Sequence, residues 1–116
     1  MNKPDDNATL DAERLAALSA LQARDISSQR VLAATLGLSL GKTNFLLKAL
    51  LAKGQTKAES FRRSDNKLAY LYVLTPSGVA ERARLTRLFL RRKEQEYERL
   101  RAEIAGLRHE IEKIDR

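Results

Sequence analysis

The side chains best suited to chemistry in this sequence are cationic, amide and hydroxyl groups, and they gather in three short stretches. The first reads as the start of a helix and holds Ser39, Gly41, Lys42, Asn44, Phe45 and Lys48. The second is a polar turn with Arg62, Arg63, Asn66 and Lys67, and the third opens a short helix with Ser27, Ser28, Gln29 and Arg30. Such groups donate hydrogen bonds to phosphate oxygens and base edges, so they indicate a nucleic-acid partner.

The charge distribution favours the same kind of partner. The 116 residues carry a net charge of +7, and residues 24–67 hold nine basic against three acidic side chains, a net +6. A second basic stretch, residues 82–93, has six cations and no acid. A basic middle of this kind fits a polyanion such as nucleic acid. Solubility alone is the alternative explanation of the charge.

No catalytic constellation is found in the sequence, so we expect neither an enzyme nor a cofactor. No carboxylate pair lies in an apolar context, no phosphate-binding glycine loop is present, and no nucleophile lies beside a base. His109 is the only histidine, and it falls at a position facing water. Without cysteines, disulfides and thiolate metal sites are excluded, and we expect no metal.

The ends and the hydropathy of the chain predict a soluble protein of the cytoplasm. The first residues are polar, unlike a signal peptide, and no run approaches the ~18 apolar residues of a membrane span. We therefore expect a cytoplasmic protein, associated with the bacterial nucleoid when bound to DNA, and no membrane partner.

Helix signals in the first half of the chain predict a helix-turn-helix. Residues 1–8 are expected to be disordered, and Thr9 caps a first helix to about residue 23. Ser27 or Ser28 caps a short second helix, which Gly37 ends in a left-handed cap. Ser39 caps a third helix, through residue 52, that stops at Gly54. Two short helices joined by so tight a turn are typical of the helix-turn-helix motif.

The second half predicts a hairpin and a long helix. Residues 55–63 and the β-forming run 68–74 flank a polar turn and form a β-hairpin. Because Gln55 and Thr56 are polar, the first strand is expected to be short or loosely packed. Thr75 caps the last helix, with Pro76 at its first position. The fold class is thus mainly α with a small β-hairpin (α+β): a winged helix-turn-helix at 9–78 and a long helix at 79–116.

The third helix has one face suited to the core and one suited to DNA. At about 100° per residue, the first face holds Thr43, Leu46, Leu47 and Leu50. The other holds Gly41, Asn44, Phe45 and Lys48, with Lys42 at its edge. In a major groove, Asn pairs with adenine and Lys reaches guanine or phosphate. The alternative for Asn44 and Lys48 is a solvated face. Phe45 either contacts a thymine methyl or the sugar-phosphate edge, or tucks against the hairpin.

The turn of the hairpin and the start of the second helix are candidates for backbone contact. Four cationic or amide groups at the hairpin tip reach phosphates, or place an arginine in a narrow minor groove. At the start of the second helix, hydroxyls and backbone N–H groups suit a phosphate. Solvation is the alternative for the hairpin tip. The basic stretch 82–93 also leaves open a membrane-surface element.

The end of the chain carries a heptad pattern. Residues at a and d form a narrow apolar stripe: Tyr97, Leu100, Ile104, Leu107, Ile111 and Ile114. In a parallel pair, Glu96 faces the partner's Arg101 and Glu103 faces the partner's Arg108, while Glu110 meets the partner's Asp115 as a mismatch. An antiparallel pair would oppose most of these charges to their own sign. We therefore expect a parallel homodimeric coiled coil from about residue 94, with two-fold symmetry.

These residues resemble those of the MarR-type winged-helix regulators, and more narrowly the small branch named exopolysaccharide-associated. The stretches that carry the resemblance are Ser27–Arg30, Leu36–Leu50, Lys53–Gly54 and Tyr72–Gly78. It covers roughly residues 10–100. The resemblance implies a dimeric DNA-binding transcriptional regulator, with the third helix in the major groove and the wing on the flanking minor groove. It also implies polysaccharide-synthesis genes as targets. The chain has little spare sequence to line an effector pocket, so we do not expect a small-molecule effector.

Two other functions are alternatives to the binding of an inverted-repeat DNA operator. A winged domain also serves as a protein–protein adaptor, with the coil joining two copies or recruiting a different coil. The basic amphipathic stretch 82–93 would instead serve a regulator that binds a membrane surface. An assay of binding to random duplex DNA at low salt distinguishes the adaptor from a DNA-binding protein. Sedimentation with anionic liposomes tests the membrane-surface regulator.

Overall fold

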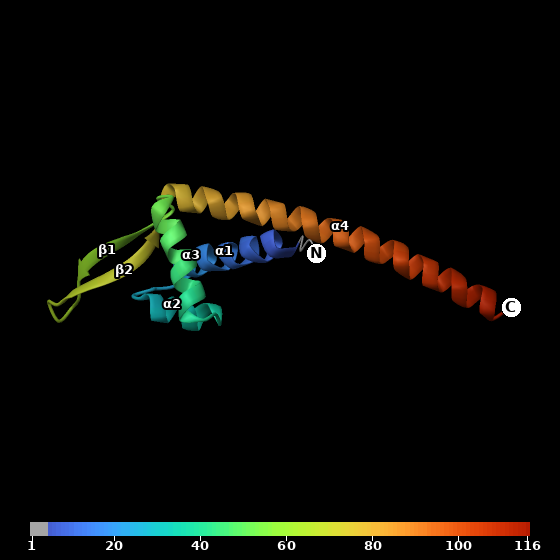
Figure 1. The fold of residues 1–116 in the computed structure, drawn as a ribbon, viewed down its shortest axis with the longest axis horizontal. Helices are drawn as coiled ribbons and strands as arrows, with labels where there is room; N and C mark the ends of the chain where they lie inside the picture. Colours follow the sequence, from blue (N-terminus) through green and yellow to red (C-terminus); the bar gives the residue numbers. More distant parts are fainter. Residues whose placement is uncertain (1–4) are drawn as a thin grey trace. The chain divides into compact units, whose positions relative to one another are not determined.

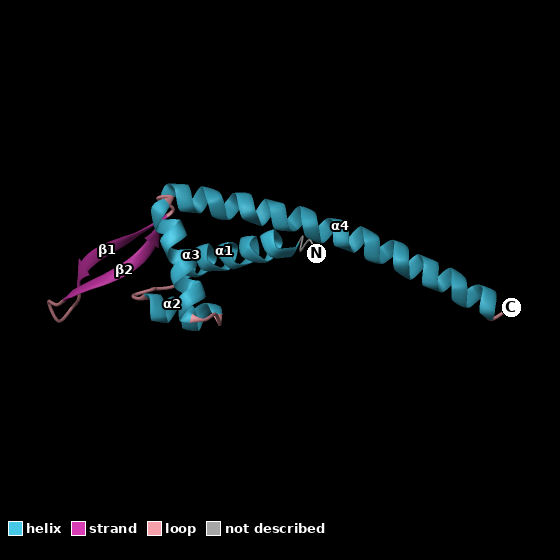
Figure 2. Ribbon diagram, viewed as in Figure 1, coloured by secondary structure: helices cyan, strands magenta, loops and turns pink. Residues whose placement is uncertain are grey.

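The computed structural model describes residues 5–116, and it has the element order that the sequence predicts. The elements are α1 (Asp5–Ala23), α2 (Gln29–Leu36), α3 (Leu40–Ala52), β1 (Thr56–Arg62), β2 (Leu68–Leu74) and α4 (Pro76–Ile114), as Figure 1 shows. Figure 2 shows the same mainly helical chain with its one hairpin. The fold class, a winged helix-turn-helix with a long C-terminal helix, is confirmed. Two compact units divide the chain within α4, between Leu85 and Thr86.

The first helix begins earlier than expected. It starts at Asp5, so the predicted cap at Thr9 is wrong, and residues 5–8 are helical where disorder was predicted. These four residues include neither Gly nor Pro, so nothing in them stops the helix from extending towards the N-terminus. Residues 1–4, also predicted to be disordered, lie outside the described residues.

The helix-turn-helix is closed by local caps at both ends of its turn. The Ser28 hydroxyl accepts a hydrogen bond from the Val31 N–H at 3.1 Å, which settles the choice between the two predicted serines. Gly37 ends α2 with φ of 66°, a left-handed conformation that L side chains rarely adopt. The Ser39 hydroxyl caps α3 by accepting from the Lys42 N–H at 3.1 Å. The three caps fix the direction in which α3 leaves the turn.

The core of the first unit is a layer of aliphatic side chains between the helices. Among the described residues the largest fully buried side chains come from all three short helices, the loop before α2 and the start of α4: Leu18, Ile26, Leu32, Leu46, Leu50, Leu85 and Thr43. The predicted inner face of α3 is confirmed, since Thr43, Leu46, Leu47 and Leu50 are all buried. Thr43 is accommodated because its hydroxyl donates to the Ser39 carbonyl at 2.9 Å.

The hairpin is longer than the polar start of its first strand suggested. Strands β1 and β2 pair antiparallel over seven residues each, from Thr56 opposite Leu74 to Arg62 opposite Leu68. Of the two expectations for the first strand, the short length is therefore wrong, whereas loose packing agrees with its exposure beyond Thr56. Thr56 is buried because its hydroxyl donates to the Val73 carbonyl at 2.7 Å, so the polar residue has a partner inside the sheet. The rest of β1 is exposed.

The chain crosses itself at the step from the wing to α4. The Thr75 hydroxyl donates to the Gly54 carbonyl at 2.5 Å and accepts from the Gly78 N–H at 3.1 Å, which caps α4 as predicted. The Thr75 N–H donates to the Gln55 carbonyl at 3.1 Å. At this crossing a Cβ on Gly78 would overlap the Gln55 carbonyl oxygen and lie 3.0 Å from the carbonyl carbon. Only glycine fits there without moving the backbone.

Polar contacts join α1 to the first turns of α4. Arg14 donates to Glu81 at 2.5 Å, and the Glu81 carboxylate also accepts from Arg84 at 2.6 Å. The pKa of Glu81 is lowered from 4.5 to about 2, chiefly by the hydrogen bond from Arg84 and also by Arg14, against the opposing effect of burial. Arg82 donates to the Ser19 hydroxyl at 3.1 Å. These contacts position the start of α4 against α1.

The second unit, Thr86–Arg116, is the remainder of α4. Its predicted heptad residues are exposed, with exposed fractions from 40% at Ile104 to 70% at Ile114. They form an apolar stripe that nothing covers in the described residues. Across the described part of the chain, no helix combines the length and apolarity needed to cross a membrane.

Replacing Gly78 by alanine tests the crossing. We expect Gly78→Ala to destabilise the protein by about 3 kcal/mol, because its methyl group meets rigid backbone at Gln55. Urea unfolding followed by circular dichroism measures this loss. The control is Gly41→Ala, whose Cβ meets nothing within 4 Å in an exposed helical position and should be neutral or stabilising by about 0.5–1 kcal/mol. Equal effects of the two substitutions would contradict the close approach.

Titration of Glu81 should make stability pH-dependent. Its folded-state pKa lies below the ordinary value, so its ion pairs stabilise the protein above about pH 4.5 and this stability is lost as the pH falls towards 2. Because Arg84 is largely exposed and water screens it, we expect a loss of roughly 1–2 kcal/mol. Glu81→Gln should flatten unfolding free energy against pH in this window. Glu59→Gln, in an exposed pair with Lys57, should leave it unchanged. A wild-type profile flat from pH 5 to 2.5 would contradict the assignment.

Candidate nucleic-acid interface

The outer face of α3 is accessible to a partner. Gly41, Lys42, Phe45 and Lys48 are exposed and Asn44 is half-buried, while the opposite side of the helix is packed in the core. Phe45 has 59% of its surface exposed, which disfavours the alternative that it tucks against the hairpin. The predicted residues of α3 thus lie together on one surface. An outward phenylalanine among amide and ammonium groups combines apolar and polar contact on that surface.

Lys42 has a partner that the sequence did not indicate. Its Nζ lies 3.2 Å from Oε1 of Glu13, which belongs to α1. The side chain of Glu13 is only 17% exposed, whereas that of Lys42 is 42% exposed. Contacts between residues so far apart in sequence leave no periodic signal, so sequence reasoning had no means of finding Glu13.

The residues predicted at the start of α2 divide into two pairs. Ser28 and Gln29 make hydrogen bonds within the helix-turn-helix: the Ser28 hydroxyl caps α2, and the Gln29 amide donates to the Leu40 carbonyl at 3.5 Å. That bond joins the N-terminal ends of α2 and α3. Ser27 and Arg30 are exposed and available to a partner. The four residues therefore lie at one end of the helix-turn-helix, with different tasks.

The tip of the wing is a compact, preformed turn. Arg62 donates from Nη1 to the Asn66 side-chain oxygen at 3.3 Å, and Asn66 has φ of 65°, which asparagine tolerates. Arg63 pairs with Asp65 at 3.7 Å, and the Asp65 carboxylate also accepts from the Lys67 N–H at 3.1 Å. Asp65 was missed as a site residue, although aspartate in a four-residue polar turn is a recognisable turn-forming signal. The cations of the tip are held close together and remain exposed.

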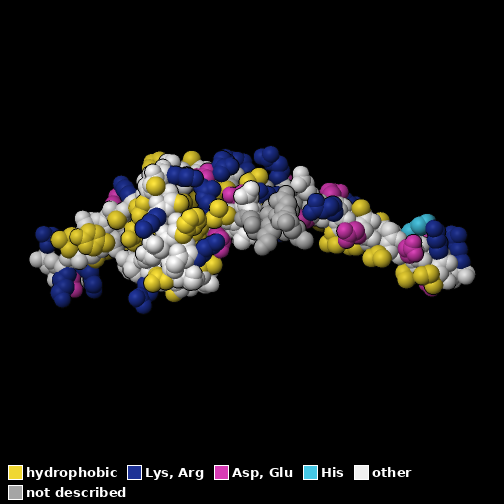
Figure 3. Space-filling model, in the orientation of Figure 1, with side chains coloured by type: hydrophobic (Ala, Val, Ile, Leu, Met, Phe, Trp, Pro, Cys, Tyr) yellow, Lys and Arg dark blue, Asp and Glu magenta, His cyan; other side chains and the backbone are white. Residues whose placement is uncertain are grey.

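Large apolar side chains stand exposed on the same hairpin. Phe61, Leu68 and Tyr70 have 42%, 57% and 59% of their surfaces exposed. Figure 3 shows hydrophobic side chains over the hairpin, with lysine and arginine at its end. The sequence predicts a β-strand at 68–74 but not the exposure of its large apolar side chains. Apolar and cationic groups thus share the wing surface.

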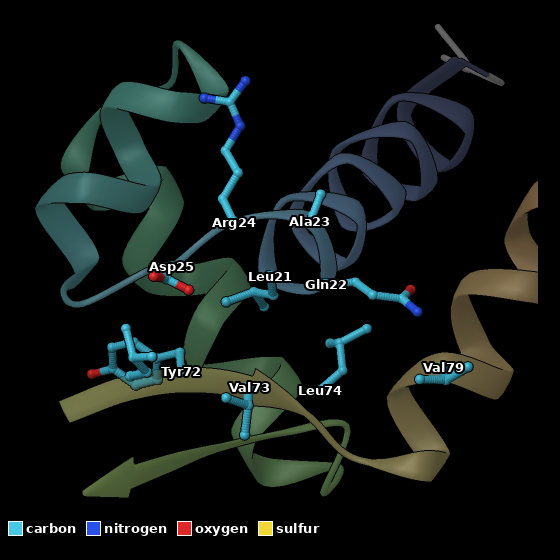
Figure 4. Close-up of a pocket in the computed structure, with 10 residues that line it drawn as sticks. Leu21, Gln22, Ala23, Arg24, Asp25, Tyr72, Val73, Leu74 and Val79 are labelled. Atoms are coloured by element: carbon cyan, nitrogen blue, oxygen red, sulfur yellow. The ribbon is translucent and has the colours of Figure 1, made fainter. Parts of the chain in front are cut away.

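A cavity of about 390 Å³ lies between the end of α1, strand β2 and the start of α4. Its walls are mixed: they include the apolar Leu21 and Leu74 and the polar or charged Gln22, Arg24 and Asp25. In Figure 4 the Arg24 side chain extends away from Leu74. The cavity therefore offers both apolar and polar contact. Within residues 5–116, no cluster of three or more His, Cys, Asp or Glu side chains could hold a metal ion.

The charged residues predicted to flank the coiled coil have contacts within their own helix. Lys93 donates to Glu96 at 3.3 Å, and Arg101 lies 3.6 Å from Glu98 and over the Tyr97 ring. A shallow groove along the apolar stripe is lined by Ile104, Leu107, Arg108, Ile111 and Glu112. If α4 paired with another helix, some of these ion pairs within α4 would be replaced by ion pairs between the two helices.

Several solved structures of transcriptional regulators are similar to this chain. The PcaV transcriptional regulator from Streptomyces coelicolor is 23% identical with a TM-score of 0.53, and the match covers 69% of this chain and 57% of PcaV. The transcriptional repressor CouR, bound to a 23-mer DNA duplex, is 24% identical with a TM-score of 0.58, covering 97% and 83%. A single-residue mutant of MepR from S. aureus is 17% identical with a TM-score of 0.57, covering 87% and 86%.

The sequence comparisons add no nearer relative: no protein-family model and no curated protein matches the chain. The match spans less than two thirds of PcaV, and all three identities are below 25%. Likeness at this level establishes the fold. The chain has the winged-helix fold of these transcriptional regulators, which is the fold that the sequence predicts.

Proposed function

We propose that the protein is a sequence-specific, double-stranded DNA-binding transcriptional regulator that acts as a homodimer. The observation that carries this proposal is the outer face of α3, where amide, ammonium and aromatic groups are exposed over a packed inner face. A helix held in this way enters a major groove with its N-terminal residues against the base edges. The fold shared with CouR, which is bound to a DNA duplex, supports the same use of the motif.

Three side chains of α3 have distinct roles in this proposal. Asn44 pairs with adenine in the major groove, where an amide matches the donor and acceptor of that base. Lys48 reaches guanine or phosphate, and Lys42 does so from the edge of the face. Ser39 keeps its hydroxyl in the helix cap and contributes through position only. Gly41 leaves room for close approach of the backbone, since a Cβ there meets nothing within 4 Å in the free protein.

The wing and the start of α2 supply backbone contacts. Arg63 and Lys67 at the exposed tip reach phosphates or a minor groove, while Arg62 and Asn66 keep the turn in shape. Ser27 and Arg30, at the start of α2, are also exposed. If a dimer makes about eight phosphate contacts, the logarithm of its affinity falls with that of salt concentration at a slope near −7.

The second unit supplies the proposed dimer interface. Its exposed heptad stripe needs an apolar cover, and a second copy of this helix in parallel register is the occupant that we propose. Charge complementarity supports this register, because Glu96 and Glu103 then face the partner's Arg101 and the partner's Arg108. Two-fold symmetry makes the operator an inverted repeat with half-sites about one turn, ~34–36 Å, or a multiple apart.

The remaining parts of the proposal come from the sequence. The DNA-binding domain is placed at 9–78 and the dimerisation helix at 79–116. Genes of exopolysaccharide synthesis are the proposed targets, and the cytoplasm, with its nucleoid DNA, is the proposed site of action. An effector ligand is not part of the proposal.

Selection of genomic fragments by the purified protein tests the function. We expect one enriched motif in two inverted copies, with the half-site spacing given above. At low salt the protein should also bind random duplex, by the cationic groups of the wing and α2. Failure to bind any duplex at low salt would overturn DNA binding and favour the adaptor, for which the exposed apolar residues of the wing offer a docking surface.

Asn44→Ala should relax base choice without abolishing binding. Losing one amide contact to a base costs about 1–3 kcal/mol of discrimination, so the ratio of operator to scrambled-duplex affinity should fall roughly 5- to 160-fold. Fluorescence anisotropy on both duplexes measures this ratio. Arg63→Ala is the matched control, because loss of a phosphate contact should weaken both duplexes alike. An equal loss on both duplexes for Asn44→Ala would remove its proposed reading role.

A further inference from the structure

The pair between Glu13 and Lys42 links the proposed reading helix to a carboxylate of α1. Lys42 lies in the first turn of α3, where its N–H is already bonded to the Ser39 cap. Its ammonium extends to Glu13 Oε1 at 3.2 Å. A cation on the surface expected to meet DNA is therefore neutralised by the protein itself before DNA arrives.

The burial of Glu13 makes this contact more than a chance surface pair. Only 17% of its side chain is exposed, and Oε1 is enclosed with no hydrogen bond of good geometry among the described residues, so the ammonium is its compensating charge. The neighbouring carboxylate on α1, Asp11, pairs with Arg14, which also serves Glu81. An enclosed carboxylate that loses its cation is destabilised, so withdrawing Lys42 from Glu13 is costly.

We propose that Glu13 is a specificity-determining residue that withholds Lys42 from DNA phosphates, an inference that rests on the proposed DNA-binding function. When the protein binds a random sequence, a DNA phosphate can only replace the Glu13 carboxylate as the charged acceptor of the Lys42 ammonium. The phosphate also brings its own negative charge towards Glu13. In an operator, hydrogen-bond acceptors that are aligned with α3 compensate for the loss of the Glu13–Lys42 pair. Glu13 therefore lowers the affinity for random duplex more than the affinity for the operator.

The direct test is Glu13→Gln, which keeps the size of the side chain and removes its charge. We expect its affinity for random duplex to rise about 3- to 5-fold, since the restraining pair is partly exposed. The slope of log affinity against log salt should steepen by about 0.9, the value for one additional neutralised phosphate. The ratio of operator to random affinity should fall. Fluorescence anisotropy over a salt series measures all three.

Two further variants separate the pair from a general effect of charge. Asp11→Asn removes the same charge two residues away on α1 and reports the change that any lost carboxylate produces. Glu13→Gln in a Lys42→Gln background should then have no more effect than Asp11→Asn, because no ammonium remains to be released. Glu13→Asp keeps the charge and shortens its reach, so it should raise random-duplex affinity by a smaller factor even if Glu13→Gln does not fold.

The outcomes distinguish this inference from the proposed function. If the wild-type protein binds no duplex, DNA binding itself fails. If the wild-type protein binds DNA but Glu13→Gln and Glu13→Asp leave random-duplex affinity and salt slope unchanged, the inference alone is overturned. The inference is likewise overturned if Glu13→Gln matches Asp11→Asn, or if its effect persists in full without Lys42.

Discussion

The close approach of Gly78 to the Gln55 carbonyl is the constraint on which the first unit depends. At this crossing the chain leaving α3 meets the chain leaving β2, and the carbonyl accepts the Thr75 N–H at 3.1 Å. The contact is between two backbone segments, so rotation of a side chain cannot relieve it. A Cβ at position 78 would overlap the Gln55 carbonyl. The crossing ties the end of α3, both ends of the hairpin and the start of α4 to one another. It thereby fixes the position of the wing relative to the outer face of α3.

The charges of the first unit are compensated differently at the start of α4 and on α3 with the wing. At the start of α4, the Glu81 carboxylate accepts from Arg14 and Arg84, so the charge of this carboxylate is compensated within the protein. On α3 and the wing, the cations are exposed, and acids restrain only some of them: Glu13 at Lys42 and Asp65 at Arg63. A polyanion therefore meets available positive charge on α3 and the wing. The acids there reduce its attraction for any polyanion, which favours a partner that also offers specific acceptors.

Features with a local cause could be predicted from the sequence, and those with a distant cause could not. The caps at Ser28, Ser39 and Thr75 and the left-handed Gly37 follow from residue type and spacing, and the structure has each of them. The inner face of α3 follows from helical periodicity. The burial of Thr56 was missed, because its hydroxyl is bonded to a carbonyl seventeen residues away. Glu13 was missed for the same reason, since its partner lies on another helix.

In the proposed function, two winged domains are held together and read DNA as a pair. Sedimentation equilibrium of the full chain, alone and with a duplex carrying the selected operator, measures this pairing. We expect two chains per particle at micromolar concentration and two chains on each duplex. A single chain per particle in solution together with a single chain per duplex would contradict it.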